Sequence, residues 1–277
     1  MKPNNKILKF AIDARMFQIF INNEMVNAKI KVPIHLAFGH EFVSALVKTF
    51  FIDKSDSLFL THRNIHYTSI FSKNSKKIYN NFSLKNVDKN LNLGSMNFLD
   101  NESAIKYTSS ILGNNLSIAS GFAESNKRSN SVVFCVTGDG AIEEGAFYET
   151  LLLSKSLGLR IVFIVENNNF SMATTIKERR YNFDLRKLSN SLGIEYAYFK
   201  RENLNKNIDN YVKLLKKVRR QSNPLICEFE IKTLGSFMNK KNKINYHHGP
   251  MKLGFDDNIL IHKNQRDILY LMKKKLK

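Results

Sequence analysis

Cysteine and proline are scarce in this chain of 277 residues, and long hydrophobic runs are missing. Its two cysteines, Cys135 and Cys227, cannot build a disulfide framework, so we expect reduced core thiols in a cytoplasmic protein. The four prolines do not cluster with glycines into a linker, which indicates a single domain over residues 1–277. No stretch approaches the roughly eighteen consecutive apolar residues of a transmembrane helix. The N-terminus also lacks the apolar core of a signal peptide.

The chain carries a strong excess of positive charge. It has 43 lysines and arginines against 24 aspartates and glutamates, for a formal net charge of +19. Such an excess is typical of proteins that bind nucleic acid, an acidic membrane or a phosphorylated ligand. The basic residues, however, are mostly lysines dispersed among asparagines. We interpret the charge first as a compositional bias and next as a surface for an acidic partner subunit, and we expect no nucleic acid and no membrane as partner. A basic nucleic-acid-binding protein is the remote alternative.

Predicted helices and strands alternate along the chain. Apolar periodicity predicts helices at 7–27, 40–50, 115–126, 141–157, 203–220 and 257–277. Short apolar runs predict strands at 58–63, 131–136, 160–165 and 224–231, and a polar inserted loop is expected at 72–92. Buried strands separated by helices are typical of an α/β fold in which a parallel sheet is covered by helices on both faces.

Polar residues follow two of the predicted strands. Asp139 stands in VTGDGAIEEG just after the strand at 131–136, and Asn168 stands in IVENNNF just after the strand at 160–165. The helix between them makes a crossover unit, so both residues should reach the same edge of the sheet. Glycines beside Asp139 allow close backbone approach, and the helix start at Ala141 offers N–H groups to a phosphate. Carboxylate and amide oxygens suit Mg²⁺. A magnesium-diphosphate site is therefore predicted, although a turn and a solvated loop would also explain these residues.

These segments carry a resemblance to a known family. G-D-G followed by E-N-N looks like the thiamine-diphosphate motif, and the chain more narrowly resembles the α subunit of E1 components of 2-oxo acid and acetoin dehydrogenases. The matching stretches are HLAFGHE at 35–41, FLTHRN at 59–64, LGSMNFLD at 93–100, GDGAIEEGAFYET at 138–150 and HHGP at 247–250. The resemblance implies the diphosphate-binding domain of the thiamine-diphosphate-binding fold.

The resemblance also implies a role for each matching residue. Mg²⁺ would be bound by Asp139, Asn168 and the backbone carbonyl of Phe170. Thiamine diphosphate would be bound by His62, Arg63, Ser110, Leu112, Asp139, Gly140, Ala141 and Asn168. The catalytic candidates are His35, His247 and His66, because histidine moves protons near neutral pH. Each of these histidines could instead serve only as a structural hydrogen-bonding group.

The implied activity is that of a thiamine-diphosphate- and Mg²⁺-dependent oxidoreductase subunit that decarboxylates a 2-oxo acid and transfers the acyl or aldehyde unit. In this family the cofactor-activating glutamate lies on a pyrimidine-binding domain, for which this chain is too short. We therefore expect an E1 β-like partner in an α2β2 heterotetramer, and a lipoyl-bearing E2 as a further partner. The alternative reaction is a transketolase-like two-carbon transfer in specialised pathways such as surface-sugar biosynthesis.

Several positions depart from the family pattern. His40 stands where glutamine is usual, and Asn97 stands where histidine is usual. The segment THRNIHY is shortened by one histidine, and the chain is shorter than the usual dehydrogenase α subunits. These departures leave the substrate open, and pyruvate is not assigned.

Overall fold

The computed structural model describes residues 2–72, 74–85, 98, 102–127, 130–172, 174–181, 183–235, 237–238, 243–244, 249–251, 253–255 and 257–276. The chain divides into two compact units. The first unit is made of Met1–Phe51, His62–Thr108 and Ile231–Lys277, and the second of Ile52–Thr61 and Ser109–Glu230. That the whole chain forms a single domain stays a prediction.

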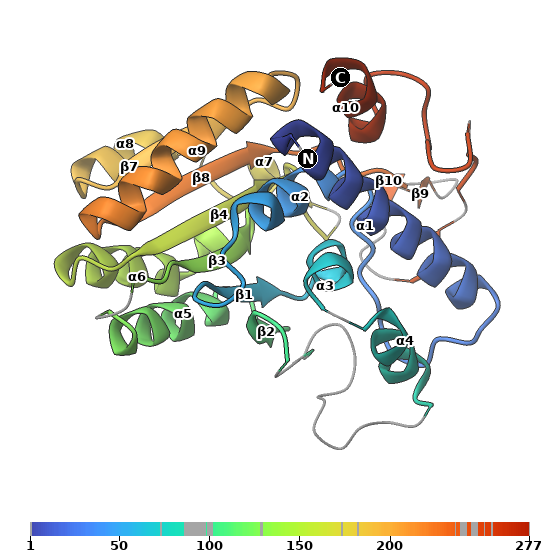
Figure 1. Cartoon of the computed structure of the whole chain (residues 1–277), viewed down its shortest axis with the longest axis horizontal. Helices are drawn as coiled ribbons and strands as arrows, with labels where there is room; N and C mark the ends of the chain where they lie inside the picture. Colours follow the sequence, from blue (N-terminus) through green and yellow to red (C-terminus); the bar gives the residue numbers. More distant parts are fainter. Residues whose placement is uncertain are drawn as a thin grey trace. The chain divides into compact units, whose positions relative to one another are not determined.

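A parallel sheet forms the centre of the second unit (Figure 1). Its strands are β1 (Ser57–Thr61), β3 (Val133–Gly138), β4 (Ile161–Asn167), β8 (Leu225–Glu230) and β7 (Glu195–Phe199), in that spatial order. The four pairs of neighbours among them all run parallel. A further strand, β2 (Ile105–Ser109), stands first in the order of the sheet, where the chain passes from the first unit to the second. The central strands are buried along almost their whole length, as continuous apolar runs predict.

Helices cover both faces of this sheet. They are α5 (Asn114–Ser125), α6 (Gly145–Ser156), α8 (Leu185–Ser191) and α9 (Leu204–Gln221), with the single turn α7 (Ile176–Arg179) after β4. The crossover from β3 through α6 to β4 and the crossover from β7 through α9 to β8 run in opposite directions along the sheet. Because such connections are right-handed, α6 and α9 lie on opposite faces (Figure 1). The predicted α/β architecture is confirmed.

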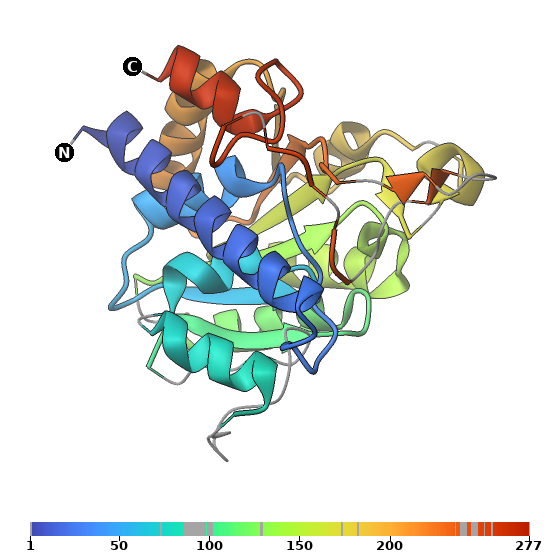
Figure 2. The same cartoon turned by 90° about the vertical axis from the view of Figure 1, so that its right-hand side faces the viewer.

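Helices dominate the first unit. They are α1 (Pro3–Val26), α2 (Glu41–Phe50), α3 (Ile65–Phe71), α4 (Ser75–Ser83) and α10 (Ile268–Lys275), and α1 is the long dark blue helix of Figure 2. A fully buried arginine ties three of them together. Arg15 of α1 donates to Glu41 of α2 (2.6 Å) and to both carboxylate oxygens of Asp267 (3.0 Å each), the residue that caps α10. The unit also contains a short pair of strands, β9 (Phe237–Met238) and β10 (Lys243–Ile244).

Three sequence predictions need correction, and several elements were missed. The helix predicted at 141–157 is a 3-10 turn, η2 (Ala141–Glu143), followed by α6, because Glu144 is extended (φ −74°, ψ 142°). The helix predicted at 257–277 begins only at Ile268. The polar loop predicted at 72–92 contains α4. The strands β2 and β7 and the helices α3 and α8 were missed. The other predicted strands and helices are found, with ends displaced by a few residues.

Candidate functional site

The two residues predicted to share one sheet edge do meet in the second unit. Strands β3 and β4 run side by side, with Gly138 opposite Glu166, so the chain segments that follow both strands leave from the same edge. The main-chain N–H of Asn168 hydrogen bonds to the carboxylate of Asp139. Asp139 is buried, whereas Asn168 is partly exposed. The Asp139 carboxylate and the main chain of Asn168, from distant parts of the sequence, therefore converge, as the crossover argument predicts.

A side chain at Gly140 would press on Ser171, which would have to shift. A Cβ atom built on it would lie 2.9 Å from Ser171 Oγ and 3.0 Å from Ser171 Cβ. Ser171 belongs to β5 (Phe170–Ser171), which forms a small hairpin with β6 (Thr174–Thr175) directly after the Asn168 loop. The G-D-G turn and this hairpin are thus in close contact.

The segment before α5 lies against the same turn. Gly113 has φ +74°, a left-handed conformation that favours glycine, and a Cβ there would lie 3.0 Å from the Cβ of Glu144. The preceding residues Ser110, Ile111 and Leu112 are exposed. The predicted cofactor residues Ser110 and Leu112 are therefore exposed to solvent and lie close to the turn that contains Ala141.

An arginine neutralises the buried carboxylate of the site. Arg179 of α7 contacts Asp139 (Nη2 to Oδ2, 2.9 Å) and also Glu143 (Nη2 to Oε1, 3.0 Å). The neighbouring Arg180 adds a second contact to Glu143 (2.9 Å). Burial raises the pKa of the Asp139 carboxyl above its usual value, and the hydrogen bond and charge of Arg179 limit that rise. The site thus pairs its anionic side chains with cations of the same chain.

The loop after β4 has a defined hydrogen-bonded shape. Asn168 Oδ1 accepts the main-chain N–H of Phe170 (3.0 Å), and Asn167 Oδ1 accepts that of Asn169 (3.0 Å). Asn169 is left-handed at φ +66°, a conformation that asparagine tolerates better than most residues. The side-chain oxygen of Asn168 and the carbonyl of Phe170, both predicted metal ligands, are therefore presented by one compact turn.

The predicted histidines belong to the first unit. His35 and His62 stack edge to face with ring centroids 4.7 Å apart, and His66 is similarly placed beside His40 at 5.3 Å. His40 also hydrogen bonds to Thr233 (Nε2 to Oγ1, 2.9 Å). Arg63 donates to the carbonyl oxygen of Leu36. His247 and the departure at Asn97 lie outside the described residues.

The sequence model for the dehydrogenase E1 component matches residues 11–196, which is more than half of the chain. The chain belongs to the dehydrogenase E1 component family. Among curated relatives, this E1 chain is similar to the pyruvate dehydrogenase E1 component subunit alpha of Rickettsia felis, at 28% identity over 70% of this chain and 60% of the relative. It also matches the corresponding subunit of Rickettsia bellii at 32% identity, over 49% of this chain and 42% of the relative.

A third relative is the alpha subunit of acetoin:2,6-dichlorophenolindophenol oxidoreductase of Bacillus subtilis, at 35% identity over 29% of this chain and 25% of the relative. The E1 chain thus matches about half of the length of its first curated relatives. Among solved structures it resembles the transketolase of Campylobacter jejuni, with a TM-score of 0.61 and 17% identity over 97% of this chain and 47% of that one. This likeness shows the thiamine-diphosphate-binding fold that the sequence predicts.

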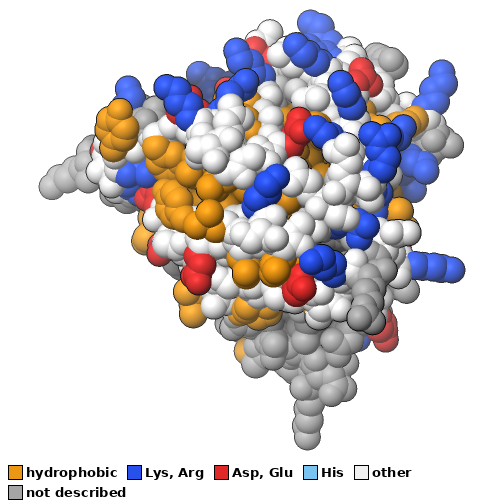
Figure 3. All heavy atoms as spheres, turned by 90° about the vertical axis from the view of Figure 1, so that its left-hand side faces the viewer, with side chains coloured by type: hydrophobic (Ala, Val, Ile, Leu, Met, Phe, Trp, Pro, Cys, Tyr) orange, Lys and Arg blue, Asp and Glu red, His pale blue; other side chains and the backbone are white. Residues whose placement is uncertain are grey.

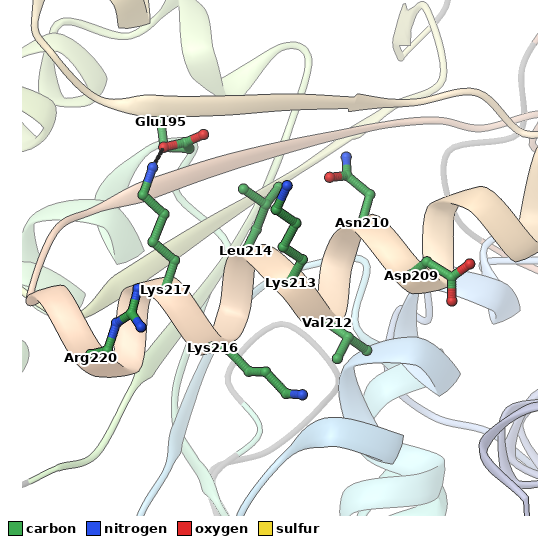
Figure 4. A pocket seen from close by; sticks show the side chains of 9 residues that line it. All are labelled: Glu195, Asp209, Asn210, Val212, Lys213, Leu214, Lys216, Lys217 and Arg220. Carbon is green, nitrogen blue, oxygen red and sulfur yellow. Dashed lines mark hydrogen bonds and ion pairs between the residues drawn. The ribbon is translucent and has the colours of Figure 1, made fainter.

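A groove of about 670 Å³ runs along α9, away from the predicted site (Figure 4). Lysines and an arginine line it, with Lys217 paired to Glu195, the first residue of β7. The groove therefore reaches the amino ends of the strands, whereas Asp139 and Asn168 follow the carboxyl ends.

On the face shown in Figure 3, basic side chains are interspersed with acidic and hydrophobic ones. In the described part of the E1 chain, no helix is long and apolar enough to span a membrane.

Sequence reasoning missed two residues that shape the site. Arg179 forms an ion pair with Asp139, but it lies in a run of charged residues, and nothing in that run predicts which carboxylate it contacts. Glu228 accepts a hydrogen bond from the side chain of Asn167 (2.6 Å). One signal could have found it, because Glu228 is a buried carboxylate within the otherwise apolar run LICEF of the E1 chain.

Proposed function

We propose that this E1 chain is the α subunit of a thiamine-diphosphate- and Mg²⁺-dependent oxidoreductase that decarboxylates a 2-oxo acid and transfers the acyl or aldehyde unit. Membership of the dehydrogenase E1 component family supports the class of reaction. The observation that carries the proposal is the convergence of Asp139 and Asn168 at one sheet edge. The transketolase structures share only the fold with this chain and do not favour two-carbon transfer.

The residues at this edge fit a metal-bound diphosphate. Asp139, Asn168 and the carbonyl of Phe170 are hard oxygen donors, and Mg²⁺ prefers a few such donors together with phosphate oxygens. Gly140 and Ala141 follow Asp139 directly in the chain, so their main-chain N–H groups lie near the same point. Arg179 contacts Oδ2 of Asp139, and its guanidinium suits a phosphate group.

The remaining residues would orient the cofactor and move protons. When bound, thiamine diphosphate supplies the carbanion-stabilising chemistry that side chains lack. In the proposal, Gly140 and Ala141 donate main-chain N–H groups to the diphosphate, and Ser110 and Leu112 support the rings. His62 and Arg63 approach the phosphates. We assign proton transfer to His35, His66 and His247, since imidazole titrates near neutral pH.

The proposed holoenzyme needs a second kind of subunit. An E1 β-like chain with a pyrimidine-binding domain would complete the site in an α2β2 heterotetramer, in the cytoplasm. A lipoyl-bearing E2 would then accept the acyl unit. Family membership and the named α subunits among its relatives support this arrangement.

The proposal is tested by measuring cofactor affinity. The full chain is co-expressed with its E1 β-like partner, and thiamine diphosphate is titrated by calorimetry with and without Mg²⁺. Asp139→Ala and Asn168→Ala should each weaken Mg²⁺-dependent binding by more than about 100-fold, because even changes to residues behind metal ligands cost roughly 10–100-fold.

The matched controls for these variants are Asp209→Ala and Asn210→Ala, which remove the same two side-chain types from exposed positions of α9. Both controls should bind the cofactor like the wild type. Unchanged affinity in Asp139→Ala and Asn168→Ala would refute the metal-diphosphate site. Incubation of the complex with 2-oxo acids and with ketose phosphates would then identify the reaction from its products.

A further inference from the structure

The loop that presents Asn168 and Phe170 is tied to the neighbouring strand β8 by the side chain of Asn167. Asn167 is the last residue of β4, and its Nδ2 donates to Glu228 Oε1 over 2.6 Å. Two further hydrogen bonds shape the loop, because Asn167 Oδ1 accepts the Asn169 N–H and Asn168 Oδ1 accepts the Phe170 N–H. The bond to Glu228 ties the start of the loop to β8, the neighbour of β4 in the sheet.

Glu228 is itself held from its other side. The hydroxyl of Tyr196 on β7 donates to Glu228 Oε2 over 2.6 Å. Tyr196 lies diagonally across from Glu228 on the same face of the paired strands, because the register places Tyr198 opposite Glu228. Each carboxylate oxygen thus receives one donor, one from the loop and one from β7. Burial raises the pKa of the Tyr196 hydroxyl, and the Glu228 hydrogen bond raises it further, so the hydroxyl stays protonated as a donor.

Strand packing alone does not account for this carboxylate. Glu228 is only 9% exposed, and burying a charge is costly unless hydrogen bonds compensate. Among the described ion pairs, none involves Glu228, so its compensation comes from Asn167 and Tyr196. An apolar residue at position 228 would pack equally well in β8, but it would leave the Asn167 amide without its hydrogen-bond acceptor.

We propose that Glu228 is a positioning residue for the metal-binding turn. Held by Tyr196, it fixes the side chain of Asn167 and so sets where Asn168 and the Phe170 carbonyl meet the metal-bound diphosphate. This inference rests on the proposed function, since it concerns the approach of that ligand to this turn. Glu228 touches neither the metal nor the reacting atoms.

The test compares Glu228→Gln with Glu230→Gln. Both variants remove one negative charge from β8, but Glu230 is exposed and lies two residues further along the strand. In the complex with the E1 β-like partner, Glu228→Gln should weaken Mg²⁺ affinity at saturating thiamine diphosphate by about 10–100-fold. Glu230→Gln should leave it unchanged. Tyr196→Phe, a milder change that keeps the ring, should weaken it several-fold.

Two further measurements separate positioning from simple stabilisation. Hydrogen–deuterium exchange in the full chain without ligand should accelerate at the Phe170 amide in Glu228→Gln, but not in Glu230→Gln. The double variant Asn167→Asp/Glu228→Gln reverses donor and acceptor, and it should recover Mg²⁺ affinity that Asn167→Asp alone loses.

The possible results lead to different conclusions. Wild-type Mg²⁺ affinity in Glu228→Gln, with unchanged exchange at Phe170, would overturn the positioning role and leave the proposed function standing. A drop in thermal stability without a change in Mg²⁺ affinity would overturn it equally. If the wild-type complex itself shows no Mg²⁺-dependent cofactor binding, the proposed function fails as well.

Discussion

The two glycines that flank Asp139 have different surroundings. A Cβ on Gly138 would have ordinary contact with the Glu166 carbonyl oxygen at 3.9 Å, whereas a Cβ on Gly140 would press on Ser171 at 2.9–3.0 Å. Gly140 has φ −77°, which any residue can adopt. Its requirement for glycine is therefore steric and not conformational, and it comes from the hairpin packed against the turn.

Gly140→Ala should accordingly disturb the turn more than the fold. The added methyl group must displace Ser171 by a few tenths of an ångström, and we expect thiamine diphosphate affinity to fall about 10-fold, as for other changes just behind a metal site. The measurement is calorimetric titration of the α/β complex. Adding Ser171→Gly should restore binding, because it removes the contact partner.

Gly121→Ala is the control for this prediction, because a Cβ at Gly121 in α5 would meet nothing within 4 Å. It should raise the free energy of unfolding by about 0.5–1 kcal/mol and leave affinity unchanged. Wild-type thiamine diphosphate affinity in Gly140→Ala would contradict the prediction, because it would show that Ser171 can shift without disturbing the turn.

The sequence predicts which residues of the site come together only where the order of strands and helices along the chain determines it. Asp139 and Asn168 follow two strands joined by one crossover, so their convergence follows from the parallel direction of the strands in such units. The partners of these residues could not be predicted in the same way. Arg179 reaches Asp139, and Glu228 reaches Asn167, through contacts that depend on how the loop and the neighbouring strand pack.

At the scale of elements, several contacts hold the start of α10 in the first unit. Asp267 caps this helix by accepting the Leu269 N–H (3.0 Å), accepts the Ile261 N–H (2.8 Å), and pairs with the buried Arg15. Burial alone would raise the pKa of Asp267, but the Arg15 and main-chain hydrogen bonds outweigh it and hold the pKa below its usual value. The charged form is therefore the one that stabilises the fold.

Asp267→Asn should destabilise the protein in a pH-dependent way. Near neutral pH it should lower the free energy of unfolding by about 3–5 kcal/mol, because it leaves the Arg15 charge buried without its full partner. A depressed pKa adds stability above the pKa of the unfolded chain, and this stability is lost as pH falls through the folded value. The difference from wild type should therefore shrink below about pH 4.

Urea unfolding of both proteins across this pH range measures the effect. Asp257→Asn is the control, since its pair with Lys273 is exposed and long at 3.9 Å, and it should change stability by less than about 1 kcal/mol. A difference for Asp267→Asn that does not depend on pH would contradict the linkage.

Elements with a strong periodic pattern were predictable, and those shaped by packing were not. The apolar strands β3, β4 and β8 and the amphipathic α9 were predicted from sequence alone. The helix predicted at 257–277 is too long because Leu260 and Ile261 are buried in irregular chain, where apolar spacing imitates a helix. The helix predicted at 141–157 breaks at Glu144, and the spacing of apolar residues gives no indication of this break.

At the scale of the whole molecule, the interior of the second unit contains both cysteines. Cys135 lies in β3 and Cys227 in β8, and both are fully buried. Burial raises the pKa of both thiols, so neither forms a reactive thiolate under ordinary conditions. The two thiols therefore report on the opening of the sheet itself.

Thiol labelling should consequently follow unfolding of the second unit. With Ellman's reagent at mildly alkaline pH, we expect no thiol to react in the native protein on the timescale of minutes, and both to react in denaturant. The native labelling rate should be suppressed by at least about 1,000-fold, because exposure requires unfolding that costs at least about 5 kcal/mol. Rapid labelling of one cysteine in native buffer would show that its strand opens independently.

The ion pair between Arg179 and Asp139 has a consequence for the order of events when the enzyme is loaded. A bare divalent ion would meet a carboxylate whose charge is already balanced, and it would be repelled by the guanidinium beside it. A magnesium ion that arrives already chelated by pyrophosphate carries negative charge of its own, which the arginine can attract. Metal and cofactor should thus enter as one preassembled complex, and a large excess of the free ion should not substitute for it.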